Sequence, residues 1–107
     1  MIYKFKSKAG ADVIMMGPQG DQVLALLGRE PASQGLLAVA TLTQAMACLE
    51  RAAADDDAAF AALQAEAAAA GQTLPRREGI SLRQRVWPLL ELMRHSLQAG
   101  QDVFWGV

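Results

Sequence analysis

The chain has 107 residues, a length typical of one domain and too short for two ordinary ones. Its 10 basic and 11 acidic residues leave a formal net charge of -1, which argues against binding to nucleic acid mainly by phosphate neutralisation and opposes self-association only weakly. Cys48 is the single cysteine, so the sequence excludes an intramolecular disulfide and the secreted scaffolds that depend on one.

The compartment follows from what the sequence lacks. Residues 1–6 alternate apolar and basic side chains, whereas a signal peptide needs a continuous apolar run after its charged start. No stretch approaches the roughly 20 apolar residues needed to cross a bilayer. We therefore expect a cytoplasmic protein with no membrane partner.

The first part of the chain predicts a β-hairpin. Residues 2–6 alternate, with Tyr3 and Phe5 on one face and Ile2, Lys4 and Lys6 on the other. Residues 12–16 form a short apolar run with β-branched residues at its centre, which predicts a second strand. The turn region at 8–11 allows the two strands to pair.

The next segments predict a short helix and an uncertain extended piece. Pro18 in a first turn, or Asp21 as a cap, can start a helix that stops at Gly28. Residues 36–40 fit either a short strand or an extended segment.

A long helical region follows. Thr41 and Gln44 fit a capping box, and apolar residues then keep one helical phase through the three aspartates at 55–57. The pattern predicts one long helix, or two nearly collinear helices of which the second is capped by an aspartate, ending at Gly71. Large anchors are few in the alanine-rich residues 58–70, so we expect this end to project or to fray.

The last part predicts a helix and a strand. Ser81 and Gln84 form a second capping box, Gly100 ends the helix, and residues 102–105 resemble a terminal strand. Strands and helices do not alternate as βαβ units require. The sequence therefore predicts a single α+β domain at 1–107, with a small, largely antiparallel sheet of three to four strands packed against two or three helices.

The residues known for catalysis and metal binding are scarce. Cys48 and His95 are the only cysteine and the only histidine, and they lie on different predicted helices without paired spacing, so we expect no metal site and no catalytic residues. Cys48 fits a small half-buried filler and His95 a surface residue. Neighbouring side chains in a helix diverge by 100°, so the aspartates at 55–57 are expected to cap or be solvated rather than to converge on one ion. We predict no cofactor.

The turn at Gly17, Gln19 and Gly20 is the nearest approach to a phosphate cradle. Glycine amides and a helix N-terminus attract anions. The turn has no lysine and carries an acid at Asp21, so the alternative is a plain strand-to-helix turn.

Trp87 marks one candidate interaction surface, on the flank of the last helix that also carries Arg83, Glu91 and Arg94. Tryptophan stacked on arginine is common at interfaces. The alternative is that Pro88 bends the helix and turns Trp87 onto the core.

A second candidate surface is basic, with four arginines within ten residues: Arg76, Arg77, Arg83 and Arg85. Such a set can contact an acidic partner or a phosphate. The alternative is that these are solvated charges of a loop and a helix, because Arg83 and Arg85 point about 200° apart.

Nearly the full length resembles an uncharacterised bacterial family, known as domain of unknown function 1840. The resemblance is carried by these residues: 3–8, 12–15, Gly17-Pro18 with Gly20-Asp21, 77–79, 81–85 with Trp87-Pro88, and 105–107. It implies a proteobacterial cytoplasmic protein and no assigned activity, so it adds no catalytic residue.

We therefore expect a non-enzymatic interaction or adaptor domain that forms a homo-oligomer, with any other protein partner unknown. A rival hypothesis is a protein that binds a small molecule or an anion such as a phosphorylated metabolite. Weak nucleic-acid binding is a third and less favoured hypothesis.

Overall fold

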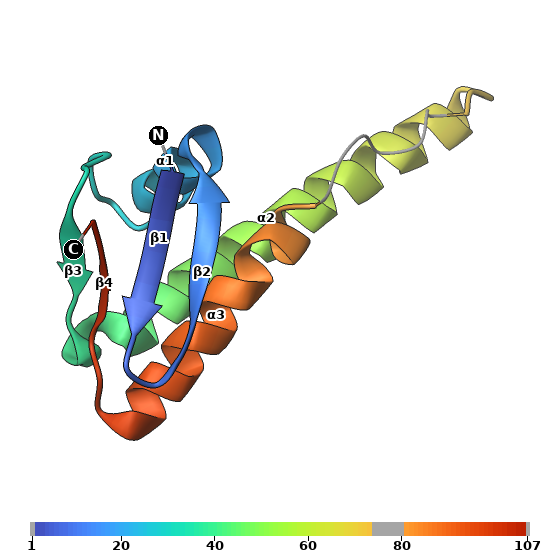
Figure 1. The fold of residues 1–107 in the computed structure, drawn as a ribbon. Helices are drawn as coiled ribbons and strands as arrows, with labels where there is room; N and C mark the ends of the chain where they lie inside the picture. Colours follow the sequence, from blue (N-terminus) through green and yellow to red (C-terminus); the bar gives the residue numbers. More distant parts are fainter. Residues whose placement is uncertain (1, 74–80, 107) are drawn as a thin grey trace.

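The computed structural model describes residues 2–73 and 81–106. In chain order the elements are β1 Ile2–Ser7, β2 Gly10–Met16, α1 Gly17–Leu26, β3 Gly35–Leu37, a 3-10 turn Val39–Thr41, α2 Leu42–Ala69, α3 Leu82–Ala99 and β4 Val103–Trp105 (Figure 1). The predicted α+β class is confirmed.

The strands form one antiparallel sheet in the order β2-β1-β4-β3. The predicted hairpin is confirmed, with β1 and β2 joined by a tight turn. The last strand of the chain, β4, lies between β1 and β3. The short run at 36–40, which the sequence left open, is an edge strand followed by a 3-10 turn.

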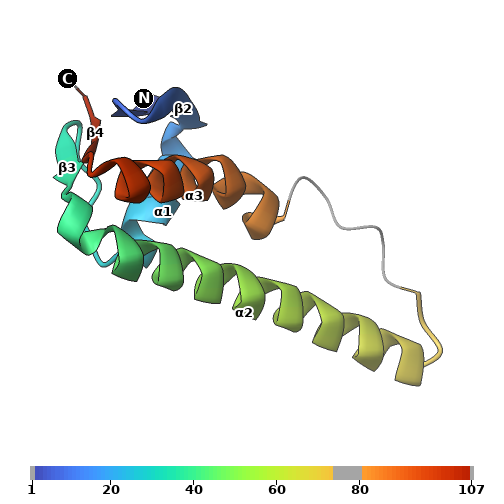
Figure 2. The same cartoon turned by 90° about the horizontal axis from the view of Figure 1, so that it is seen from below.

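The molecule has three layers (Figure 2). Helices α1 and α3 cover one face of the sheet, and α2 packs on the far side of these two helices. Beyond its contact with α3, the alanine-rich end of α2 extends past the rest of the structure, as the few large anchors there predict (Figure 1).

Aromatic side chains form the centre of the core. The rings of Tyr3 and Phe5 stack with centroids 6.0 Å apart, and Trp105 lies 5.6 Å from Phe5. All three are at most 2% exposed. Their face of the sheet is the one that the alternation of residues 2–6 predicts to be buried, and it is covered by α1 and α3.

Helix α2 starts at the predicted place, but the predicted capping interaction at its N-terminus is absent. Thr41 closes the 3-10 turn, and its hydroxyl donates to the Ala38 carbonyl at 2.7 Å rather than serving as a cap. A capping residue needs an extended backbone, whereas Thr41 has helical dihedrals (φ -101°, ψ -5°). The predicted capping box at Thr41 is therefore wrong.

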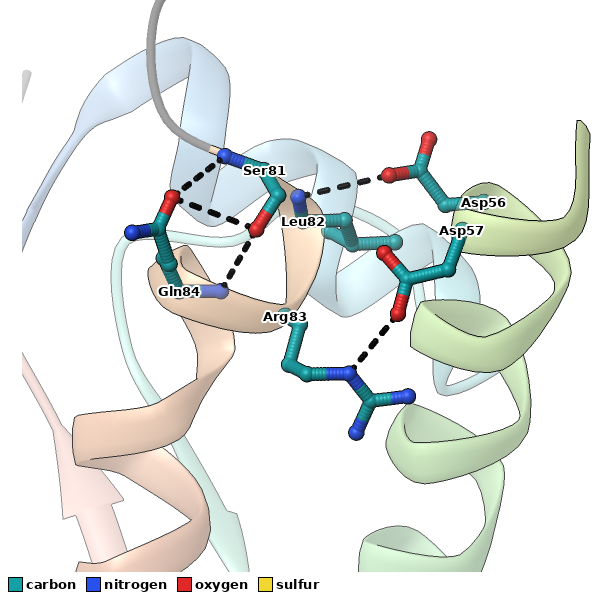
Figure 3. A network of polar contacts seen from close by, with 6 residues as sticks. All are labelled: Asp56, Asp57, Ser81, Leu82, Arg83 and Gln84. Carbon is teal, nitrogen blue, oxygen red and sulfur yellow. Dashed lines mark hydrogen bonds and ion pairs between the residues drawn. The ribbon is translucent and has the colours of Figure 1, made fainter. Parts of the chain in front are cut away.

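Helix α2 is one continuous helix, and the aspartates at its middle act on α3 rather than on a second helix of their own (Figure 3). Asp56 accepts the backbone N–H of Leu82 at 3.4 Å, and Asp57 pairs with Arg83 at 2.8 Å. The first turn of α3 also carries the predicted Ser81–Gln84 capping box. Two carboxylates of α2 thus lie at the positive end of the α3 dipole.

Replacing Asp56 by alanine is predicted to destabilise the fold through α3. The Asp56→Ala variant loses a carboxylate at a helix N-terminus, worth about 0.5–1 kcal/mol. Asp55→Ala is the matched control, because Asp55 is exposed and both changes raise the helix propensity of α2 equally. Urea unfolding should show Asp56→Ala less stable than Asp55→Ala; equal midpoints would contradict the assigned role.

Tyr3 links the sheet to α1. Its hydroxyl donates a hydrogen bond to the Asp21 carboxylate, and this bond, followed by burial, raises the pKa of Tyr3 above its ordinary 10.0. The unfolded chain then loses this proton at a lower pH than the folded one. The contribution of Tyr3 to stability is therefore complete below about pH 10 and is lost as the pH rises through the folded-state pKa.

This linkage predicts how Tyr3→Phe behaves in alkali. The wild type should be more stable than Tyr3→Phe near neutral pH, and the difference should shrink above about pH 10. Urea unfolding of both proteins from about pH 8 to pH 11 measures this, and lysine titration cancels because it is common to both. A difference that stays constant over that range would show that the Tyr3 proton is not linked to folding.

Candidate functional site

The face of the sheet opposite α1 and α3 carries a concentration of exposed apolar side chains. We call it the outer sheet face and define it by the outward residues of the four strands: Ile2, Lys4, Lys6, Asp12, Ile14, Met16, Leu36 and Phe104. No helix in the described ranges lies on it, and Figure 1 views it from the front. Of the seven large apolar residues that are exposed within residues 2–73 and 81–106, four lie here: Ile2, Ile14, Met16 and Leu36.

Strand register brings these side chains into rows. Ile2 lies opposite Met16, and Lys4 lies opposite Ile14. Phe104 on β4 lies between Lys6 on β1 and Leu36 on β3. Directly opposed side chains on one face of a sheet lie about 5 Å apart. Ile2, Ile14 and Met16 therefore form one apolar group, and Phe104 and Leu36 form a second, with the two lysines of β1 between the groups.

The charges on the outer sheet face are of both signs. Lys4 and Asp12 form an ion pair at 3.8 Å, diagonal across β1 and β2, with both side chains about half exposed. An exposed pair of this kind contributes little to stability. Its relevance is that the face presents positive and negative charge next to each other.

The sequence predicted only three of the eight residues of this surface. It placed Ile2, Lys4 and Lys6 together, but it treated residues 12–16 as a uniform apolar run. The missed signal was the alternation of Asp12, Ile14 and Met16, which shares one face once β2 pairs with β1. Leu36 and Phe104 join only because β3 and β4 extend the same sheet.

The structure brings together most of the predicted surface around Trp87. Trp87 is 52% exposed, so it does not turn onto the core. The guanidinium of Arg94 lies 5.9 Å from the Trp87 ring centroid and pairs with Glu91 on the same helix. Arg94 also lies 3.9 Å from Glu50 of α2.

Arg83 is engaged elsewhere, through its ion pair with Asp57 (Figure 3). Its charge is balanced within the fold, across the contact of α2 with α3. It is therefore a less accessible partner for a docking protein than the sequence suggested.

The predicted basic segment is only partly described. Arg76 and Arg77 lie outside the described residues. Arg83 points to α2, whereas Arg85 reaches α1 and donates to the Gln22 side chain at 3.1 Å. The divergence of these two arginines, expected from their spacing, places them on different sides of α3.

The turn at Gly17, Gln19 and Gly20 has a packing role in the structure. Gly17 and Gly20 are buried, and a Cβ on Gly20 would stand 2.0 Å from the Tyr3 ring. Gly20 is therefore required for the close approach of α1 to β1. The Gln19 side-chain oxygen is buried without a partner among the described residues. The anion site remains a prediction.

Cys48 is half-buried, as predicted, and donates its thiol hydrogen to the Leu26 carbonyl at 2.8 Å. His95 is exposed, also as predicted. Within residues 2–73 and 81–106, no group of three or more histidine, cysteine, aspartate or glutamate side chains is arranged to hold a metal ion. None of the described helices is both long and apolar enough to cross a membrane.

Comparison with known proteins gives one match. The family model described as "Domain of unknown function (DUF1840)" matches residues 1–105. No curated protein and no solved structure matches the chain. The match covers all the described strands and helices, and the chain belongs to the DUF1840 family.

Proposed function

We propose that the protein is a non-enzymatic interaction domain that self-associates, and that two copies pack their outer sheet faces together. One observation carries the proposal: a sheet face with four exposed aliphatic side chains has no described helix upon it. Large exposed apolar patches flanked by polar residues often mark sites of protein–protein interaction.

Charge favours a second copy as the occupant. The net charge of -1 gives two copies little mutual repulsion. The outer sheet face holds Lys4 next to Asp12, and a two-fold axis close to this pair would place the lysine of one copy near the aspartate of the other. Two sheets packed face to face lie about 10 Å apart, which suits interdigitated side chains of this size.

The expected affinity is modest. Burying a whole aliphatic side chain contributes about 1.5–3 kcal/mol, and these side chains are already 38–53% buried, since Ile2, Ile14, Met16 and Leu36 are 61%, 62%, 61% and 47% exposed. Across both copies the remaining burial yields roughly 7–14 kcal/mol. Association costs about 4–15 kcal/mol, so we expect a dimer that dissociates on dilution.

A charge at Ile14 tests the proposal. Ile14 is 62% exposed, so Ile14→Asp should leave the monomer folded while placing a carboxylate in the proposed interface, beside Ile2 and Met16. Light scattering coupled to size-exclusion chromatography over a range of concentrations should show a dimer for the wild type and a monomer for Ile14→Asp. The change should weaken dimerisation at least tenfold, because an unpaired charge would be buried.

Leu63→Asp is the matched control. Leu63 has a similar exposure of 54% but lies on the projecting part of α2, so this variant should dimerise like the wild type. A wild type that stays monomeric at high concentration would overturn the proposal. So would a dimer that Leu63→Asp disrupts and Ile14→Asp does not.

A further inference from the structure

A groove lies along the outer edge of β3, and it shares only Leu36 with the outer sheet face. Its walls are residues 26–29 at the end of α1, residues 36–38 on β3, and the first two turns of α2 with Thr41, Gln44, Ala45 and Cys48. Its volume is about 510 Å³, within the range of ligand-binding clefts. The groove begins where α1 ends at Leu26, and it lies between the residues that follow α1, β3 and the start of α2.

The wall formed by β3 offers backbone groups. β3 is last in the strand order and pairs only with β4 among the described residues. Its other edge therefore presents N–H and C=O groups to which an extended peptide can add as a further strand. The segment is three residues long, so such pairing would be short and would depend on side-chain contacts for affinity.

The floor of the groove is suited to an aliphatic side chain. Leu26, Leu27 and Leu37 supply most of the apolar wall, and Ala45 leaves space between them. The one thiol, on Cys48, already donates to the Leu26 carbonyl. The thiol is therefore already hydrogen-bonded and needs no polar partner from a ligand.

Arg29 stands at the mouth of the groove as a prepared anion receptor. Its guanidinium lies 5.6 Å from the ring centroid of Trp105. Trp105 is 2% exposed and donates its indole N–H to the Ala32 carbonyl at 3.0 Å, which fixes the platform. No carboxylate in the described part of the chain pairs with Arg29, and a guanidinium held on an aromatic ring binds carboxylate with little loss of side-chain entropy.

We propose that this groove binds the C-terminal end of a partner polypeptide in extended form. Its backbone adds to the free edge of β3, its last aliphatic side chain enters the space beside Ala45, and its terminal carboxylate pairs with Arg29. A peptide fits better than a free apolar acid because only a peptide satisfies both the strand edge and the guanidinium.

The test uses fluorescein-labelled peptides of alternating threonine and valine that end in leucine, either as the free carboxylate or as the amide. Fluorescence anisotropy should show binding of the free carboxylate, weakened about tenfold by C-terminal amidation or by Arg29→Gln, since each removes a charged hydrogen bond. Arg51→Gln is the matched control, because Arg51 is an exposed arginine of α2 outside the groove.

Hydrogen exchange distinguishes a peptide from a free acid. Peptide binding should slow exchange of the amides of β3, whereas decanoate should not displace the peptide at equal concentration. No binding of the free-carboxylate peptide at about 1 mM, equal binding of the amide, or an Arg29→Gln variant that binds like the wild type would each overturn the proposal. Tighter binding of decanoate without β3 protection would instead identify a site for free apolar acids and overturn it too.

The measurement is independent of self-association when it is made in Ile14→Asp. That change lies on β2, at the far side of the sheet from the groove. Peptide binding should be the same in this variant as in the wild type. Loss of dimerisation with retained peptide binding would show two separate surfaces.

Discussion

The pairing of β1 with both β2 and β4 determines which side chains of these strands point into the core and which point to the outer sheet face. In that register, Tyr3 and Phe5 point to the helices together with Trp105, and the intervening residues point away. A slip of one residue would bury lysines and expose the aromatic stack. Burial of the aromatic stack therefore fixes the register, and the register in turn fixes which residues lie on the outer sheet face.

Helices α1 and α3 are held in place by contacts with the inward side chains of β1. Tyr3 joins β1 to Asp21 of α1 and packs against Gly20, where a side chain has no room. Ser96 of α3 lies fully buried with its hydroxyl 2.6 Å from that of Ser7. Helix α2 is held in a different way. It packs on α3, and two of its aspartates bind the first turn of α3. The third layer is thus joined to the sheet through α1 and α3.

Two surfaces beside this small sheet are left open by the described helices: the outer sheet face and the groove next to β3. The outer sheet face is open because the described helices lie on the other side. The groove lies beyond the end of α1, between β3 and the start of α2. Leu36 belongs to both, since β3 is at the edge: its side chain points outward while its backbone borders the groove. A domain of this size can therefore offer one surface to a second copy and another to a peptide without rearrangement.

Local patterns in the chain were enough to predict the hairpin, the helix after it, the last helix with its Ser81 cap, and the final strand. Each of these depends on alternation, periodicity or a capping residue within a few positions. The same local reasoning failed at Thr41, where a 3-10 turn gives the backbone helical dihedrals and leaves the hydroxyl no amide to cap. It also left the aspartates at 55–57 open, because their partners lie 26 residues away on another helix.

The sequence by itself determined the hairpin, the first and last helices and the final strand. It also determined that Trp87 lies near Arg94 and Glu91, since these share one helix. Only the tertiary structure decided that β4 lies between β1 and β3, that Ile14, Met16, Leu36 and Phe104 share one open face, and that Arg29 stands over Trp105. These juxtapositions depend on strand order and on where helices stop covering the sheet. Both are outcomes of packing between distant segments, and no periodicity within a segment encodes them.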